Sequence, residues 1–315
     1  MDEAEQFVSR SNPESRYKSR RFRWRPGEIA AADSEDLVDL DRQTLARRLA
    51  RDLAQGHFEL HYQPIVDMRN GRAAGFESLI RLHDRDDGIV PASEFIPFVE
   101  ENRLIDQLDE WVLGRACETA RAWSEKRGRR EPFLTVNVSR HSLADEGFGR
   151  RAAATIRDSG VDPSQLRIEI TETEIVEQKK VLRSNVERIA ETGVPIWIDD
   201  FGVGASSIRC LQTLPVTGVK IDRVFVSEGA GGRLRDAEIL EAVVELGKSL
   251  GMQLVAEGVE TVDELARVSA TGCRYVQGFL FSRSVGPERV EGFFDESLMP
   301  AAAGGTAPSD QPVYS

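Results

Sequence analysis

The chain is organised around one stretch, Ile196-Trp197-Ile198-Asp199-Asp200-Phe201-Gly202-Val203-Gly204. Three β-favouring residues run into two adjacent carboxylates, and a Gly-x-Gly turn then ends the strand. Two like charges side by side repel, so this strand end suits a bound cation, for which a divalent metal ion is the strongest candidate. An ordinary Asx turn with both carboxylates in water is the alternative. The other strands decide between the two.

Those other predicted strands carry the same signature, one polar residue set into the C-terminal half of an aliphatic run. The polar residues are Glu77, Asn137, Glu169, Lys220, Glu257 and Gln277. Period-two alternation points them inward and the flanking aliphatic side chains outward. One such residue alone is typical of a satisfied polar core position.

Carboxylates outnumber cations strongly among these positions and their neighbours. If the predicted strands meet at one end, six carboxylates would gather there with a single inward lysine. The six are Glu77, Glu169, Asp199, Asp200, Glu257 and Glu260. Such a group repels itself unless a metal ion neutralises it. The pattern therefore favours a metal site.

Strand-like and helix-like segments alternate along the chain. Strands are expected at residues 58–65, 73–82, 133–138 and 165–171, in the opening stretch, and at 219–226, 253–257 and 275–281. Helices are expected from about residue 44 and at 93–100, 106–126, 143–159, 176–192, 206–213, 236–250 and 262–270. This order predicts an α/β fold, a (β/α)8 TIM-like barrel. An open doubly wound sheet is the alternative, disfavoured because no Gly-x-Gly-x-x-Gly turn follows an early strand.

The first two strands are joined too closely for a crossover helix. Residues 66–72 contain Asn70-Gly71, which is typical of a hairpin turn. The first strand is therefore expected to be antiparallel. Pairing outward from the turn brings Gln63 near Glu77 across the ladder.

Composition limits the classes of function. A chain of 315 residues with 40% hydrophobic residues can bury one large core, and its net charge of -12 argues against a general nucleic-acid binder. The three cysteines, Cys117, Cys210 and Cys273, are far apart and are expected to be reduced thiols. No apolar run of membrane-spanning length and no signal peptide occurs, so we expect a soluble, cytoplasmic protein without a transmembrane segment.

The two ends of the chain differ from the middle. Residues 1–44 are expected to be a disordered leader, in which residues 15–25 hold six basic and three aromatic residues and no acid. Such a run could contact phospholipid or nucleic acid, although a solvated tail is the favoured interpretation. Residues 45–297 are expected to form the catalytic barrel, and residues 298–315 a flexible tail.

The expected ligand set is all oxygen, which suits Mg²⁺ or Mn²⁺ rather than zinc. A shared Asp199 with Asp200 beside it suggests two ions about 3.5 to 4 Å apart. Such pairs usually activate water against a phosphate ester. The residues alone thus indicate a two-metal phosphodiesterase or phosphatase.

Eight motifs occur in a fixed order along the chain. They are Tyr62-Gln-Pro-Ile65, Glu77-Ser-Leu79 with Arg81, Val136-Asn-Val-Ser139, Glu169-Ile-Thr-Glu172, Asp199-Asp-Phe-Gly202, Val219-Lys-Ile-Asp-Arg223, Ala256-Glu-Gly-Val-Glu-Thr261 and Gln277-Gly-Phe-Leu-Phe281. Together they resemble the EAL domain family over about residues 45 to 297. That family hydrolyses the bacterial second messenger cyclic di-GMP (c-di-GMP) to linear pGpG, so the resemblance implies a c-di-GMP phosphodiesterase, often dimeric.

The resemblance also implies a role for each matched residue. One metal ion would be bound by Glu77, Asn137, Glu169 and Asp199, and the second by Asp199, Asp200 and Glu257. Lys220 would stabilise developing charge, and Glu257 is a candidate for deprotonating the attacking water. The substrate contacts would be Gln63, Arg81 and Gln277. Glu172 would hold the loop after the fifth strand, and Glu260 would support the site from behind the ligands.

The sequence departs from the family pattern at Ser78 and in the loop after Asp199-Asp200. There Val203 lacks a hydroxyl and Ala205 lacks an aromatic ring that the family usually has. This loop is expected to order the second metal, so activity could be reduced or depend on a protein partner. Three functions stay open: an active phosphodiesterase, a non-catalytic c-di-GMP receptor, and a protein- or DNA-binding regulator on the same scaffold.

Overall fold

The computed structural model describes residues 49, 51–53, 55–84, 88–127, 132–171, 180–202, 207–227 and 234–300. Its strands are β1 (Phe58–Asp67), β2 (Arg72–Asp84), β3 (Gly88–Pro91), β4 (Phe133–Asn137), β5 (Leu166–Thr171), β6 (Ile196–Phe201), β7 (Val216–Ile221), β8 (Gln253–Ala256) and β9 (Tyr275–Val276). The longer helices are α2 (Ala92–Glu101), α3 (Ile105–Arg127), α5 (Phe148–Ser159), α7 (Lys180–Ala190), α9 (Leu234–Ser249) and α10 (Val262–Thr271). Shorter helices are α4 (Arg140–Ala144), α8 (Ser207–Thr213) and α11 (Pro287–Val290), with 3-10 turns η3 (Pro163–Gln165), η4 (Arg223–Phe225) and η5 (Glu291–Phe293).

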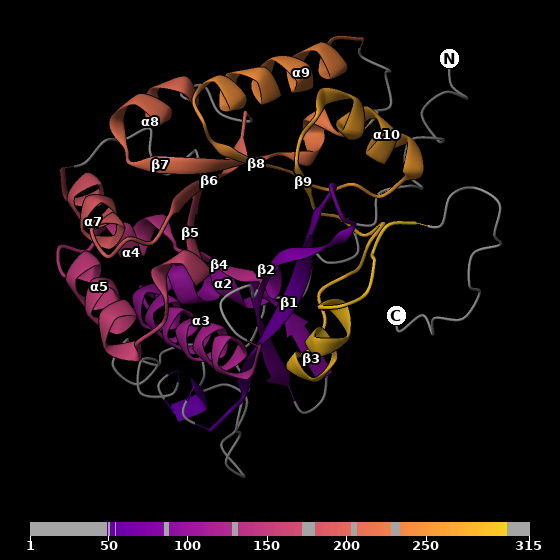
Figure 1. The fold of residues 1–315 in the computed structure, drawn as a ribbon. Helices are drawn as coiled ribbons and strands as arrows, with labels where there is room; N and C mark the ends of the chain where they lie inside the picture. The colour runs from indigo at the N-terminus through magenta and orange to yellow at the C-terminus, as the bar shows by residue number, and fades with distance from the viewer. Residues whose placement is uncertain are drawn as a thin grey trace, which may run out of the picture.

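The strands close into a barrel with the helices around its outside (Figure 1). The sheet order is β1-β9-β8-β7-β6-β5-β4-β2-β3, and β1 also pairs with β2, which closes the ring. β1 is antiparallel to both β2 and β9, whereas the neighbours from β2 through β4 to β9 are parallel. The predicted barrel with a reversed first strand is confirmed.

The predicted hairpin is confirmed. Gln63 is the partner of Glu77 in the antiparallel β1–β2 register, and Gly71 takes a φ of 70° in the turn. A positive φ of this kind is accessible to glycine at little cost. The short strand β3, which pairs with the end of β2 outside the ring, was not predicted.

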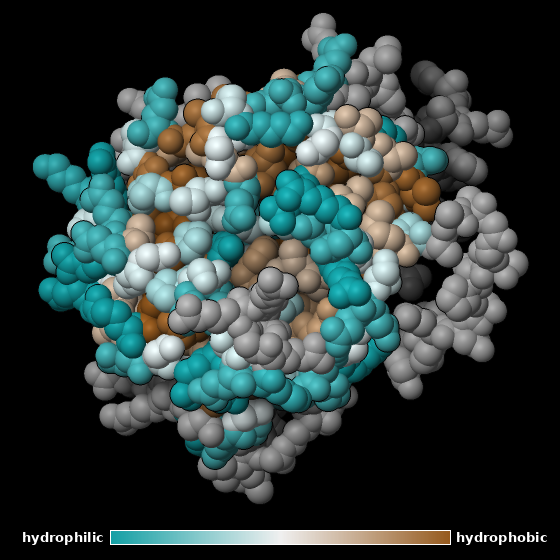
Figure 2. Space-filling model, in the orientation of Figure 1, coloured by the Kyte–Doolittle hydropathy of each residue, from teal (hydrophilic) through white to brown (hydrophobic). Residues whose placement is uncertain are grey.

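Side chains alternate between the inside and the outside of the barrel. Inside, one small cluster contains Ile65, Phe133, Trp197, Val255 and Tyr275. Outside, the main core joins the other strand faces to the helices. In the view of Figure 2, the surface of the molecule carries many hydrophilic residues with hydrophobic ones between them, which agrees with the net charge of the chain.

Three predicted element boundaries are wrong, each for a local reason. The helix expected at 143–159 is two helices, because Ser139 caps α4 and the chain turns before α5 begins. The strand expected at 219–226 ends at Ile221, where Asp222 caps η4 by accepting from the N–H of Val224. The last strand stops after two residues, because the chain turns at Gly278, whose carbonyl accepts from the Phe281 N–H.

Several predictions fall on residues outside the described ranges. These are the leader at 1–44, residues 301–315 of the predicted tail, and the roles of Glu172, Val203 and Ala205. Within the described ranges, Leu298 and Met299 pack on the core, and the Leu298 N–H donates to the Gly71 carbonyl. The three cysteines are buried, and no disulfide joins them. No described helix has the length and apolar character needed to cross a bilayer.

Candidate metal centre

Lys220 lies at the centre of a group of carboxylates inside the barrel. Its side chain is 1% exposed, and its Nζ lies 2.6 Å from Glu257, 3.1 Å from Glu169, and 3.3 Å from both Glu77 and Asp199. Burial alone would lower the pKa of Lys220, but the surrounding acids raise it well above its ordinary value. Lys220 is therefore a permanent cation.

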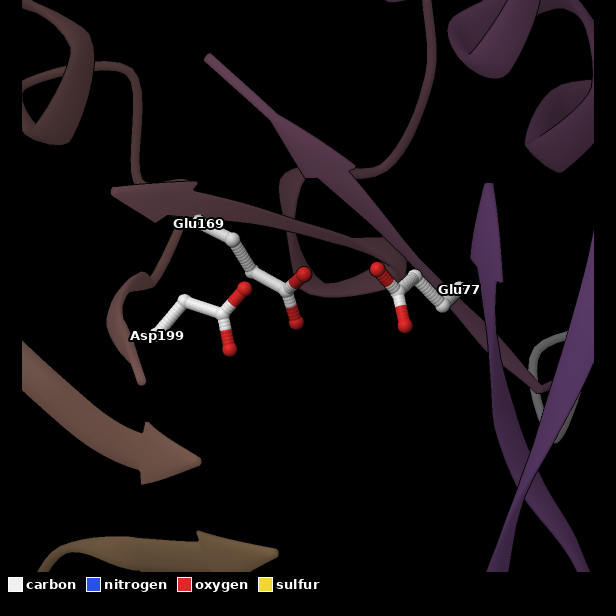
Figure 3. Close-up of side chains that lie close together, drawn as sticks. All are labelled: Glu77, Glu169 and Asp199. Atoms are coloured by element: carbon white, nitrogen blue, oxygen red, sulfur yellow. The ribbon is translucent and has the colours of Figure 1, made fainter. Parts of the chain in front are cut away.

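Strand register brings these residues together. Asn137 is paired with Glu169 across β4 and β5, and Asp199 on β6 is paired with Thr171, two residues after Glu169 on β5. All of these positions lie near the C-terminal ends of parallel strands, where barrel enzymes place their functional groups. Figure 3 shows the carboxylates of Glu77, Glu169 and Asp199 pointing toward one another from three strands.

Two amides fix the orientation of Glu77. Asn137 Nδ2 donates to one carboxylate oxygen at 2.9 Å, and Gln277 Nε2 donates to the other at 2.6 Å. Burial acts to raise the pKa of Glu77, but Lys220 and these two donors outweigh it and hold the pKa below its ordinary value. Glu77 is therefore the acid of the group that is most firmly ionised.

The other acids are held where ionisation is costly. Burial, reinforced by neighbouring carboxylates, raises the pKa of Asp199, raises that of Glu257 to about 8, and raises that of Glu169 well above its ordinary value. Glu169 Oε1 is buried and has no hydrogen-bond partner. One lysine does not neutralise this group, so an additional cation would stabilise it.

The oxygen atoms form two overlapping groups that fit metal ions. Ligand atoms of Glu77, Glu169 and Asp199 lie within 4.8 Å of one another, and so do those of Asp199, Asp200 and Glu257. Asp199 belongs to both groups. An all-oxygen set with the orphaned Glu169 oxygen among it fits hard divalent cations.

Asp200 occupies an unusual backbone conformation beside this site. Its φ is 53°, and its N–H donates to Asp199 Oδ1 at 3.0 Å. A non-glycine residue in this region costs about 1 kcal/mol or more, and such strain concentrates at functional sites. Burial first, and then Asp199 and Asp222, raise the pKa of Asp200 to about 6.

The predicted substrate contacts lie at different depths. Arg81 donates to Ser284 Oγ at 2.8 Å, and Gln63 Nε2 donates to the Ser282 carbonyl at 3.3 Å. Both side chains of the hairpin therefore contact the segment that follows β9. Gln277 is instead buried, where it holds Glu77, and its own Oε1 is buried without a partner.

Glu260 lies apart from the other acids. Its carboxylate is 3.5 Å from Arg223, and it belongs to neither group of ligand atoms. The structure thus brings together five of the six carboxylates expected at the mouth. The support predicted for Glu260 would have to act through the loop that carries Arg223.

Asp222 was assigned no role from the sequence, although it interacts with the Asp200 carboxylate. A signal was present, because Asp222 follows the inward Lys220 by two residues and therefore shares its face of the chain. Its position in the Val219-Lys-Ile-Asp motif gave the same hint.

The chain is similar to proteins of one domain family. The family model described as EAL domain matches residues 46–284. Among solved structures, the c-di-GMP complex of the PaMucR phosphodiesterase is 35% identical, with a TM-score of 0.71 over 78% of this chain and 99% of that one. The EAL domain of Mycobacterium smegmatis DcpA is 32% identical, with a TM-score of 0.62 over 76% of this chain and 97% of that one.

Two curated relatives are longer proteins. The bifunctional diguanylate cyclase/cyclic di-GMP phosphodiesterase MucR of Pseudomonas aeruginosa is 35% identical over 78% of this chain and 36% of its own length. The oxygen sensor protein DosP of Escherichia coli is 33% identical over 82% of this chain and 32% of its own length. The chain therefore spans about a third of each of these two relatives.

Proposed function

The chain belongs to the EAL domain family, and from its acidic mouth we propose that it hydrolyses c-di-GMP to linear 5'-pGpG with two bound divalent ions. The observation that carries this proposal is the pair of overlapping carboxylate groups that share Asp199 around the buried Lys220. Similarity to a phosphodiesterase solved with c-di-GMP supports the choice of substrate.

The proposal assigns a role in metal binding or charge stabilisation to each residue of the site. Glu77, Asn137, Glu169 and Asp199 would hold one ion, and Asp199, Asp200 and Glu257 the other. A pair of Mg²⁺ or Mn²⁺ ions supplies Lewis acidity and lowers the pKa of water. Lys220, cationic and fixed by four acids, stabilises the charge that develops on the phosphate oxygens.

Glu257 is the proposed acceptor of the proton from the attacking water. Burial first, and then Asp199 and Glu77, raise the pKa of Glu257 to about 8, which makes its carboxylate a stronger base than an ordinary glutamate. Gln63 and Arg81 would bind the substrate beyond the reacting phosphate, Arg81 through charge-assisted hydrogen bonds. Glu172 and Glu260 would order the loops around the site.

A receptor that binds c-di-GMP without hydrolysing it is the second candidate. The observation that favours it is the loop reading Phe201-Gly-Val-Gly-Ala-Ser-Ser207, which departs from the family at Val203 and Ala205. In that case the protein would signal through a regulatory partner. We also propose a homodimer and a cytoplasmic location, the latter because c-di-GMP is an intracellular messenger.

Conversion of c-di-GMP to pGpG by the purified chain, with Mg²⁺ or Mn²⁺ and then with EDTA, tests the proposal. Turnover that needs the metal and disappears in Glu77→Ala supports the enzyme. A matched control is Glu118→Gln, an exposed acid on α3 outside the barrel. Binding in Ca²⁺ without turnover in Mg²⁺ or Mn²⁺ would instead identify a receptor, and no binding at all would contradict both candidates.

A further inference from the structure

Two of the four histidines converge on one carboxylate at the outer end of the β1–β2 hairpin. His61 Nε2 lies 2.7 Å from Glu59 Oε1, and His83 Nε2 lies 2.9 Å from the same oxygen. His61 forms a hydrogen bond with this carboxylate, and the His83 ring nitrogen lies at ion-pair distance from the same oxygen. The mechanism proposed above uses none of the three residues.

Glu59 and His61 lie on the inner face of β1. Ile65, on the same alternation, packs inside the barrel with Trp197, whereas Tyr62 packs outside against Trp123 of α3. Successive strand residues point to opposite faces. The odd-numbered residues of β1, which include Gln63, therefore line the interior.

The same alternation places His83 and Arg81 on the inner face of β2. Phe76 packs outside against Trp123, so Glu77 and every second residue after it point inward. In the register Glu59 is opposite Arg81, four positions along each strand from the Gln63–Glu77 pair. At about 3.3 Å per residue this is about 13 Å, a span that a nucleotide covers and a phosphate alone does not.

Glu59 is oriented but still accessible. Its side chain is 31% exposed and that of His83 is 41% exposed, while His61 beneath them is only 11% exposed. Among the described residues both imidazole contacts fall on Oε1, which leaves acceptor capacity on Oε2. A carboxylate fixed in this way is prepared to accept further hydrogen bonds.

We propose that Glu59 reads a guanine base of the substrate, with His61 and His83 as positioning residues. The inference rests on the proposed function, because it names how c-di-GMP would be told from other cyclic dinucleotides. Guanine presents two adjacent donors on one edge, the ring N1–H and the exocyclic 2-amino group, and a carboxylate accepts both. Adenine has a ring acceptor at N1, which would face the negative charge without a proton between them.

Glu59→Gln tests the assignment, because the amide keeps the shape but replaces one acceptor with a donor. The measurement is kcat and KM for c-di-GMP and for its inosine analogue, which lacks the 2-amino group, with Glu118→Gln as control. We expect Glu59→Gln to raise KM for c-di-GMP by about 10- to 100-fold with a much smaller change in kcat. The wild type should prefer c-di-GMP to the inosine analogue by roughly tenfold, and the variant should lose most of that preference.

Bis(p-nitrophenyl) phosphate, a phosphodiester without a purine, separates base recognition from damage to the metal site. The ratio of kcat/KM for c-di-GMP to that for this ester should fall at least about tenfold in Glu59→Gln. An unchanged ratio would overturn the inference, because both substrates would then depend on Glu59 equally. An unchanged KM for c-di-GMP in the variant would also overturn it and leave the proposed function intact. A wild type that neither hydrolyses nor binds c-di-GMP would remove the proposed function and the inference together.

Discussion

The barrel interior holds a buried cation toward each end, and the two are stabilised in different ways. Lys220 at the mouth is surrounded by four carboxylates within 3.3 Å. Arg167 near the floor lies 4.4 Å from the ring centroid of Phe133 and 5.6 Å from that of Trp197, and it donates to the Ser164 carbonyl. One cation is matched by acids and the other by aromatic faces.

This difference makes the mouth a candidate binding site and the floor a packed part of the core. Burial lowers the pKa of Arg167 to about 10, and Tyr275, rather than a carboxylate, opposes that effect. At the mouth the acids raise the pKa of Lys220 and still exceed its charge, so that end has affinity left for further cations. Among the described residues, the mouth carries an excess of acids that a further cation would offset, and the aromatic contacts of Arg167 bring no such excess to the floor.

The largest expected effect comes from the carboxylate that both ligand groups share. Asp199→Asn should reduce kcat for c-di-GMP by on the order of 10³-fold, because it weakens both proposed ion sites at once. Without metal the variant should be at least as stable as the wild type, since one of several mutually repelling acids is gone. Steady-state kinetics and urea unfolding in EDTA measure the two effects, with Glu187→Gln on α7 as control. Full activity in the variant would contradict the shared role.

Removal of the central cation should expose the charge imbalance directly. Lys220→Met leaves the buried acids uncompensated and should lower the free energy of unfolding in EDTA by about 3–5 kcal/mol. Mg²⁺ should restore part of that loss, because it replaces the missing positive charge. The control is Lys248→Met, which breaks an exposed pair with Glu245 and should cost less than about 1 kcal/mol. Equal losses in the two variants would show that the acids do not depend on Lys220.

Asp109 on α3 shows a third way to stabilise a buried charged group, through hydrogen bonds alone. It accepts from the Ser139 N–H and the Ser142 hydroxyl, and burial raises its pKa to about 6. A raised carboxyl pKa favours the protonated folded state, so this stabilisation is present below about pH 4 and is lost as pH rises past 6. The shift of about two units corresponds to about 3 kcal/mol. Asp109→Asn should lack this decline when unfolding is followed by urea titration between pH 4 and 7.

The control for this pH series is Asp158→Asn, which changes an exposed acid on α5. It should follow the wild-type pH dependence. An Asp109→Asn variant that loses stability with pH as steeply as the wild type would show that Asp109 is ionised in the fold without cost.

The smallest effect is expected at the floor. Arg167→Met keeps the apolar stem and removes the cation over two rings, so the free energy of unfolding should fall by only about 1 kcal/mol. Because the floor holds no acid that needs this charge, kcat and KM should change less than about twofold. Urea unfolding and c-di-GMP hydrolysis check both numbers. A loss of kcat as large as that expected for Asp199→Asn would show that the metal site depends on Arg167.

Sequence reasoning located the mouth better than the floor. Each acid of the mouth interrupts an aliphatic run near a strand end, and the Asn70-Gly71 turn fixed the register of Gln63 on Glu77. Arg167 carried an equal signal, since it precedes Glu169 by two residues and so shares its face. Its partners are rings on other strands, and a pattern of charges along the sequence does not indicate a cation stabilised by aromatic faces.

The remaining errors arise where a side-chain cap or a turn interrupts an element, which the periodicity of the sequence does not indicate. Asp222 ends β7 early because its side chain caps the next turn. Glu260 was grouped with the other acids by proximity in sequence, but the chain turns at Gly258, where φ is 68°, and its carboxylate meets Arg223 instead. The contacts of Glu59 with His61 and His83 were missed because His83 lies on the neighbouring strand, and only the β1–β2 register brings it within reach of Glu59.

The pairing of Gln277 with Glu77 has a consequence for synthesis on the ribosome. The two residues are 200 positions apart, so the amide that orients Glu77 is translated long after the hairpin has emerged. Until then β1 has one free edge, because its second neighbour, β9, lies equally late in the chain. A nascent chain that stalls before β9 would therefore expose an unpaired strand edge and an incomplete site. We expect chaperones to bind such a chain and proteases to degrade it.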